Sequence, residues 1–158
     1  MEFSNQIRTK KIKRNFNLVV LLFILAALYF LWKKEDMITI YIGIGLVVFV
    51  VLVLVINFNY VSFSSANGKI SVRYYPVITL FGREYSSIDF QHELLYKYDL
   101  KTTFPFRDLT LTVKTQRGVA DYPTVSLTAL TKNELNAIRQ ELETILARQG
   151  TSRRKQGN

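Results

Sequence analysis

The side chains that most often carry out chemistry are scarce in this chain. It contains a single histidine, His92, and no cysteine. A zinc site needs several nitrogen or sulfur ligands, and a cysteine nucleophile needs a histidine beside it, so both are excluded. His92 precedes Glu93 and could act as a general base, but a surface or half-buried strand residue is the favoured interpretation.

The carboxylates are dispersed along the sequence. Those in the central part of the chain form no close pair and no Asp-x-Asp cluster: Asp89, Glu93, Asp99, Asp108 and Asp121. A glycosidase pair or a divalent-cation site therefore has little support. There is also no glycine-rich phosphate loop and no Gly-x-Ser-x-Gly motif. The sequence predicts no catalytic residue, no metal site and no cofactor, and hence a protein that is not an enzyme.

Basic residues that could attract phosphate groups are more frequent than catalytic ones. Residues 1–15 contain one acid, Glu2, and five basic residues that are candidate contacts for anionic lipid headgroups: Arg8, Lys10, Lys11, Lys13 and Arg14. A cation near a membrane surface contributes about 1 kcal/mol to such contacts. The alternative is that these residues only set the orientation of the chain in the membrane.

Aromatic rings and cations occur together farther along the chain. Six residues on neighbouring strand positions form a candidate partner face: Arg73, Tyr74, Tyr75, Tyr96, Lys97 and Tyr98. Ordinary cross-strand aromatic packing explains them equally well. The terminal cluster Arg153-Arg154-Lys155 is interpreted as part of a solvated tail, and no nucleic-acid partner is expected.

Two long apolar runs of sequence predict the helices that must position these candidate residues. Residues 16–32 and 37–56 carry no charged side chain and are separated only by Lys33-Lys34-Glu35-Asp36. A membrane-spanning helix needs about 20 apolar residues, so the two runs predict two spans. Because so short a connector cannot recross a bilayer, we expect an antiparallel hairpin over residues 16–56, with both ends of the protein on one side.

The flanking charges predict which side that is. Five basic residues precede the first span and two lie in the connector, so both termini are expected in the cytoplasm. A cleaved signal peptide is the alternative for the first run, but no small-x-small cleavage site follows it. Gly43 and Gly45 are expected to pack against the first helix, with a dimerisation face as the alternative.

The region after the spans, residues 57–149, changes to β-branched and aromatic alternation. Asn67-Gly68 predicts a type I′ hairpin turn, and Pro123 an edge position or a bulge. Roughly six or seven short strands are expected, as in an antiparallel barrel or sandwich. The strand candidates lie at 58–63, 70–74, 77–81, 85–90, 92–100, 109–113 and 119–127.

A final amphipathic helix is predicted over residues 132–147. Thr131 and Glu134 have the spacing of a capping box, Gly150 supplies a stop, and five apolar residues share one stripe: Leu135, Ile138, Leu142, Ile145 and Leu146. Residues 1–15 are then expected to be a flexible basic arm, and residues 150–158 a disordered basic tail.

The order of these elements, with the stretches 68–73, 85–90, 109–113 and 127–135, resembles bacterial membrane proteins that carry a pleckstrin-homology-like (PH-like) domain. The resemblance covers residues 18–147 and is one of pattern, without an invariant motif. It implies a transmembrane α-helical hairpin followed by an α+β cytoplasmic domain, in which a seven-strand bent antiparallel barrel is capped by the C-terminal helix. It also implies location in the inner membrane of a bacterium, contact with protein or lipid, and no catalytic residue.

Together these features predict a membrane-anchored cytoplasmic binding or scaffolding module. Its partner is expected to be another protein, or a second copy of this chain, with no small-molecule substrate. The alternative is a small accessory subunit of a membrane enzyme or transport complex, which makes its contacts through the spans.

Overall fold

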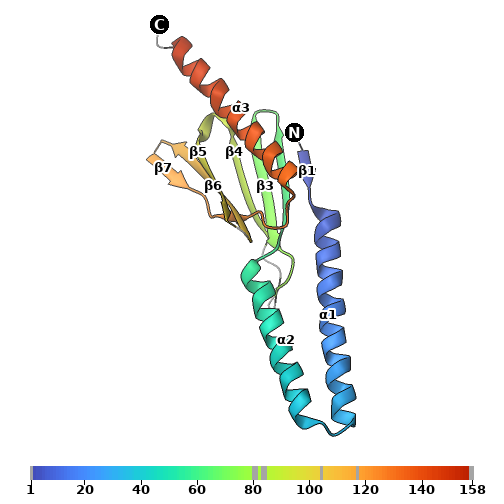
Figure 1. Cartoon of the computed structure of the whole chain (residues 1–158). Helices are drawn as coiled ribbons and strands as arrows, with labels where there is room; N and C mark the ends of the chain where they lie inside the picture. Colours follow the sequence, from blue (N-terminus) through green and yellow to red (C-terminus); the bar gives the residue numbers. More distant parts are fainter. Residues whose placement is uncertain (1, 80–81, 83–84, 104, 117, 157–158) are drawn as a thin grey trace.

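The computed structural model describes residues 2–79, 82, 85–103, 105–116 and 118–156 of the chain. Two long helices, α1 (Gln6–Trp32) and α2 (Asp36–Ile56), form an antiparallel hairpin below a β domain (Figure 1). The helix α1 begins ten residues before the apolar run, because residues 6–15 contain no proline or glycine and several good helix formers. The expectation of a flexible arm over residues 1–15 is therefore wrong.

The hairpin is held together by aromatic rings and one close backbone approach. Phe49 of α2 stacks on Phe16 and on Phe23 of α1, with ring centroids 5.8 and 6.0 Å apart. A Cβ atom on Gly45 would lie 3.3 Å from the Phe23 ring, so this glycine lets the helices approach. Gly43 faces open space, since a Cβ there would meet nothing within 4 Å. The expected packing role therefore holds for Gly45 alone.

The β domain consists of two antiparallel sheets. The first has the order β1-β2-β3-β4, and its strands are β1 (Glu2–Ser4), β2 (Asn59–Ala66), β3 (Lys69–Pro76) and β4 (Ser86–Gln91). In the second, β6 pairs with β5 along one edge and with β7 and β8 along the other. Its strands are β5 (Leu95–Thr103), β6 (Phe106–Thr115), β7 (Gly118–Asp121) and β8 (Val125–Ser126).

The two sheets do not close into the barrel that the sequence suggested. Among the described residues, no strand of one sheet pairs with a strand of the other, and a short 3₁₀ turn, η1 (His92–Leu94), separates β4 from β5. This turn also corrects the predicted strand 92–100, which begins instead at Leu95. Residues 77–79 form no strand, and the rest of the candidate strand 77–81 lies outside the described residues.

Local signals in the sequence are confirmed at several turns. Asn67 and Gly68 both have positive φ, 52° and 75°, as the predicted type I′ turn between β2 and β3 requires. Pro123 lies where the predicted strand 119–127 divides into β7 and β8. Proline has no backbone N–H to donate to a ladder, which is consistent with this break.

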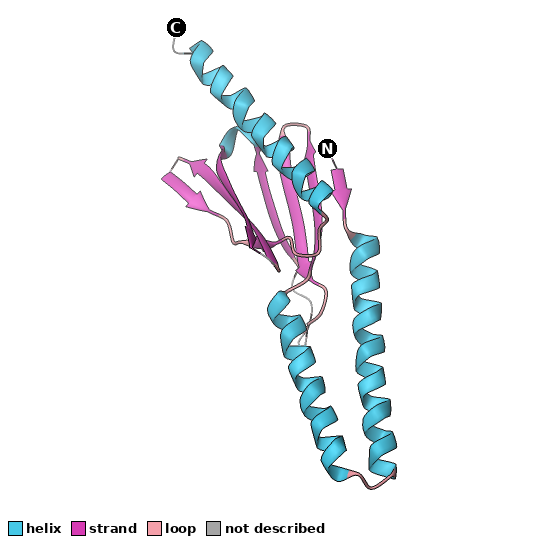
Figure 2. Cartoon of the chain, viewed as in Figure 1, coloured by secondary structure: helices cyan, strands magenta, loops and turns pink. Residues whose placement is uncertain are grey.

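The last helix, α3 (Lys132–Gln156), lies across the domain (Figure 2). Its capping box is present: the Thr131 N–H donates to Glu134 Oε2 at 2.6 Å, and the Glu134 N–H donates to Thr131 Oγ1 at 3.3 Å. The helix passes through Gly150, so the predicted stop is wrong. A glycine inside a helix costs only about 1 kcal/mol relative to alanine. The predicted disordered tail is helical to Gln156, and residues 157–158 lie outside the described residues.

One hydrophobic core joins both sheets and α3. It includes Phe63 and Ile88 from the first sheet, Leu111 from the second and Leu142 from α3, all at most 2% exposed. The apolar stripe of α3 is buried in this core as predicted, with Leu146 at its partly buried edge. The architecture is therefore two long apolar helices followed by an antiparallel-sheet domain and a C-terminal helix.

Candidate functional site

The first residues of the chain attach the helical hairpin to the β domain. The strand β1 adds to the edge of β2, and the next residue, Asn5, is 3% exposed. The Asn5 side chain donates from Nδ2 to the Asn59 carbonyl at 3.0 Å and accepts from the Val61 N–H at 2.9 Å. Its own N–H donates to the Val61 carbonyl at 3.2 Å. Since α2 continues into β2 through Asn57, both helices are held by the same strand.

Arg8 makes a second attachment, to the start of α3. Its Nη1 donates to the Ala129 carbonyl at 3.0 Å and to Glu134 Oε2 at 2.6 Å. Burial raises the pKa of Glu134, but hydrogen bonds from Arg8 and Thr131 outweigh it, and the pKa lies below its ordinary value. Arg8, predicted as a lipid contact, is thus engaged within the protein. We call the contacts of Asn5 and Arg8 the N-terminal clamp.

The other predicted lipid contacts divide between two faces of α1. Lys11 borders a hollow beside Arg8 and Glu134, next to the β domain. Lys10, Lys13 and Arg14 line a groove on another face of the helix. The five basic residues therefore form no single cluster, because consecutive helical positions point about 100° apart.

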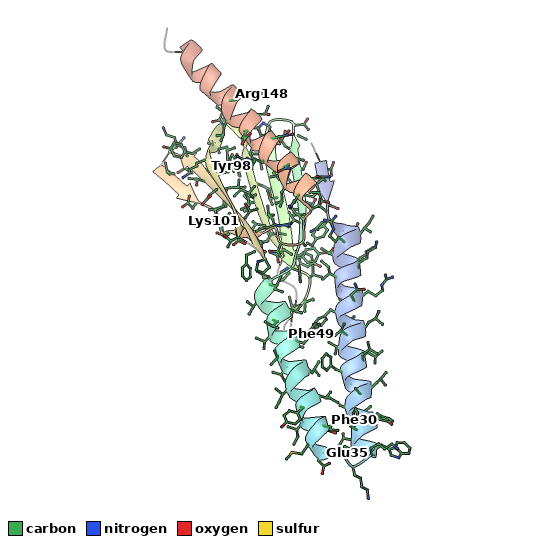
Figure 3. All side chains as sticks on the ribbon, in the orientation of Figure 1. Phe30, Glu35, Phe49, Tyr98, Lys101 and Arg148 are labelled. Atoms are coloured by element: carbon green, nitrogen blue, oxygen red, sulfur yellow. The ribbon has the colours of Figure 1, made fainter. Side chains whose placement is uncertain are left out.

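The predicted partner face is divided in the same way, by strand alternation. Tyr74 and Tyr98 pack against the core, and the Tyr98 hydroxyl donates to Glu143 of α3 at 2.9 Å (Figure 3). Burial raises the pKa of Tyr98, and the neighbouring Glu143 carboxylate adds to this effect. Tyr96 and Lys97 are exposed on β5, in the other sheet from Arg73 and Tyr75.

Arg73 and Tyr75 do belong to one surface, which we call the tyrosine hollow. Tyr75 stacks on Tyr60 with ring centroids 4.6 Å apart and lies 4.9 Å from the ring of Tyr85. The hollow has a volume of about 330 Å³ and is lined by Tyr60, Arg73, Tyr74, Tyr75, Tyr85, Ser86 and Ser87. It lies at the end of the sheet nearest the hairpin, since β2 begins three residues after α2 ends.

Sequence reasoning missed Tyr60 and Tyr85, although a signal for Tyr60 was present. The Asn67-Gly68 turn pairs Ala66 with Lys69. Counting outward from that pair in an antiparallel ladder places Tyr60 opposite Tyr75, where the structure has it. Tyr85 precedes β4 and lies outside the ladder of β2 and β3, so no such count reaches it.

His92 belongs to a polar contact between three elements. Its Nε2 lies 3.0 Å from Ser65 Oγ, and that hydroxyl donates to Glu141 Oε1 of α3 at 2.8 Å. Because a hydroxyl has one proton, Nε2 must be the donor to Ser65, and this nitrogen cannot accept a proton from it. In a hydrolytic triad the histidine lies between the serine and the acid, whereas here the serine lies between the other two. The arrangement fastens α3 to the sheet.

The two long helices meet the length and composition expected of membrane spans. Their mean hydropathy over the most apolar stretch is 2.1 for α1 and 3.0 for α2, and none of either stretch is buried inside the protein. A core helix of a water-soluble protein would be covered by its own chain. Within the described residues, no group of three or more histidine, aspartate or glutamate residues gathers to hold a metal ion.

Comparison of the chain with protein-family models, with curated proteins and with solved structures gave no match.

Proposed function

We propose that this chain is a bacterial inner-membrane protein with two spans, whose cytoplasmic β domain is a binding module for another protein. Exposed apolar helices joined by three residues support the two spans. The five basic residues before the first span, against two in the connector, support cytoplasmic termini. Two antiparallel sheets and a C-terminal helix around one core support a PH-like plan, with sheets more open than in a closed barrel.

The N-terminal clamp is the observation that carries this proposal. A domain joined to its anchor only through α2 would turn freely about that connection. Asn5 and Arg8 add contacts from α1 to β2 and α3, so the domain keeps one orientation relative to the hairpin. A binding surface held in this way meets membrane-bound partners at raised effective concentration, with less orientational freedom to lose on binding.

The tyrosine hollow is the surface that fits a protein partner best. Tyrosine and arginine are over-represented among the residues that dominate binding energies at protein interfaces. Tyr85 is 70% exposed, and Tyr75 and Arg73 line the same hollow. Its place at the hairpin end of the sheet suits a partner that is itself in the membrane, or bound to it.

Site-specific photocrosslinking in living cells tests this function. A photoreactive residue in place of Tyr85 should give a discrete crosslinked product, and Arg73→Glu should reduce its yield. The matched control places the same photoreactive residue at Val119, which is 55% exposed on β7, and should give no crosslinked product. Crosslinks of equal yield from both positions, or from Val119 alone, would contradict the proposed surface.

One observation favours the second candidate, an accessory subunit that makes its contacts through the spans. The open space at Gly43 leaves room for a helix of another protein to approach α2 closely. Replacing both spans by unrelated apolar helices separates the two functions. The binding module should keep its crosslinks from position 85, whereas the accessory subunit should lose its association.

A further inference from the structure

One face of α1 changes from basic to apolar along its length. Six exposed side chains border a shallow groove of about 400 Å³ on it: Lys10, Lys13, Arg14, Asn17, Leu18 and Leu21. Lys10, Arg14, Asn17 and Leu21 follow one another at spacings of three or four residues, and Lys13 and Leu18 flank them, so the six occupy one side of the helix. We propose that this face, the lipid face, binds the headgroup of an anionic phospholipid in the leaflet next to the β domain. The inference rests on the proposed membrane insertion of the hairpin.

The side chains of the lipid face follow the order of groups in a phospholipid. The three cations come first and can donate to phosphate oxygens. Asn17 comes next, at the level of the ester carbonyls, and its amide can donate to them. Leu18 and Leu21 are 52% and 50% exposed and continue into the apolar run, where acyl chains would cover them. From Lys10 to Leu21 the helix rises roughly 16 Å.

Within the part of the chain that the structure describes, no acidic side chain pairs with Lys10, Lys13 or Arg14. Arg8, on the domain side of the helix, pairs with Glu134 at 2.6 Å. The other three ion pairs of the described residues involve Lys69, Lys101 and Arg139. The three cations of the lipid face are therefore available to an external anion. This distinguishes them from Arg8, which the same stretch of sequence also supplies.

The lipid face also lies at the depth that a headgroup requires. Phe49 of α2 lies about midway between Phe16 and Phe23 of α1, because its ring stacks on both of theirs. Seven residues beyond Phe49, or roughly 10 Å, α2 ends at Ile56. The same rise along the antiparallel helix α1 reaches roughly residues 12–13, so Lys13 and Arg14 flank the last turn of α2 and Lys10 lies about one turn beyond it. They therefore lie where the apolar surface of the hairpin ends.

Native mass spectrometry of the full-length protein in neutral detergent tests the lipid face. Titration with phosphatidylglycerol should give tighter binding than titration with phosphatidylcholine. The variant Lys10→Gln, Lys13→Gln, Arg14→Gln should weaken phosphatidylglycerol binding by about fivefold per cation, on the order of 100-fold in all. Circular dichroism should show unchanged helix content, since the three side chains are exposed. An unchanged affinity in this variant overturns the proposal.

A matched control removes the same charge elsewhere. Lys69, Lys97 and Lys114 are exposed near the strand ends away from α2, and replacing all three by glutamine should leave phosphatidylglycerol binding unchanged. An equal loss in both triple variants would show attraction by net charge alone and would overturn the site.

Two further measurements separate this proposal from its alternatives. Soluble glycerol phosphate should not compete, because it lacks the acyl chains that Leu18 and Leu21 contact. Effective competition would identify a site for free phosphate esters and overturn the lipid assignment. If the wild-type protein remained in solution without detergent, the proposed function would fail. If it inserted into membranes but bound both lipids equally, only the lipid face would fail.

Discussion

Asn5 contributes more to the stability of the fold than its place near the chain terminus suggests. Its side chain accepts from the Val61 N–H and donates to the Asn59 carbonyl, both at the start of β2, and it is almost fully buried. Removing it leaves two backbone groups without their partner in a site that water reaches poorly. A buried backbone group without a hydrogen-bond partner costs free energy, and avoiding this cost is how the clamp stabilises the fold.

Asn5→Ala should therefore lower the free energy of unfolding of the domain by about 2–4 kcal/mol. Urea unfolding in detergent, followed by tyrosine fluorescence, measures this change. Asn15→Ala is the control, because Asn15 is exposed on α1 and its loss should cost less than about 0.5 kcal/mol. Equal effects of the two substitutions would show that the clamp does not stabilise the domain.

The ion pair of Arg8 with Glu134 makes stability depend on pH. Burial raises the pKa of Glu134, but Arg8 and Thr131 lower it further, so the folded value lies below the ordinary 4.5. A depressed carboxyl pKa stabilises the fold above the unfolded value, and that stability is lost as the pH falls through the folded value.

We therefore expect the free energy of unfolding to decrease as the pH falls from about 4.5 downward. Glu134→Gln should be less stable at pH 7 and should show a flatter pH dependence in this range. Thermal unfolding of both proteins between pH 3 and pH 7 measures the difference. A parallel decrease in both proteins would assign the acid sensitivity to other carboxylates.

At the scale of elements, Gly45 and Gly43 provide a matched pair for the hairpin. A side chain at Gly45 must displace the Phe23 ring, whereas one at Gly43 enters open space. Gly45→Leu should destabilise the packing of α1 on α2 by about 1–3 kcal/mol. Gly43→Leu should leave it unchanged in the purified protein. Titration with SDS, followed by circular dichroism, reports the stability of the helix pair.

The Gly43 variant also bears on partners. If Gly43→Leu leaves the purified protein intact but abolishes its function in cells, α2 contacts another chain at this position. If it unfolds as readily as Gly45→Leu, the helices pack in another register than the structure has.

The elements that could be predicted from the sequence are those with a local cause. Asn67-Gly68 fixes a turn through its own dihedral angles, and Thr131 with Glu134 caps a helix through its own hydrogen bonds. The strand β1 has no such signal: it is three residues long, and its partner β2 lies more than fifty residues away. Sheet closure and the tyrosine hollow likewise depend on distant pairing, so only parts of them could be inferred.

The whole molecule has a clear axis. The hairpin extends from one end of the β domain, and α3 projects beyond the other end, where Arg148 lies far from Phe30 and Glu35 (Figure 3). The basic end of α3 is therefore directed away from the membrane surface that α1 would enter. The cations of the lipid face lie on the hairpin side of the β domain, near that surface. The basic residues at the end of α3 and those of the lipid face therefore lie on opposite sides of the β domain.

The same axis makes the orientation of the chain in the membrane measurable with two single-cysteine variants. The chain has no cysteine, so Lys34→Cys in the connector and Lys114→Cys at the far end of β6 can each be labelled without background. In intact cells stripped of their wall, an impermeant maleimide should react with Cys at position 34, because the positive-inside rule puts the connector outside. Position 114 should react only after lysis. Reaction at position 114 in intact cells would place the domain outside, and its proposed partners could not then be cytoplasmic.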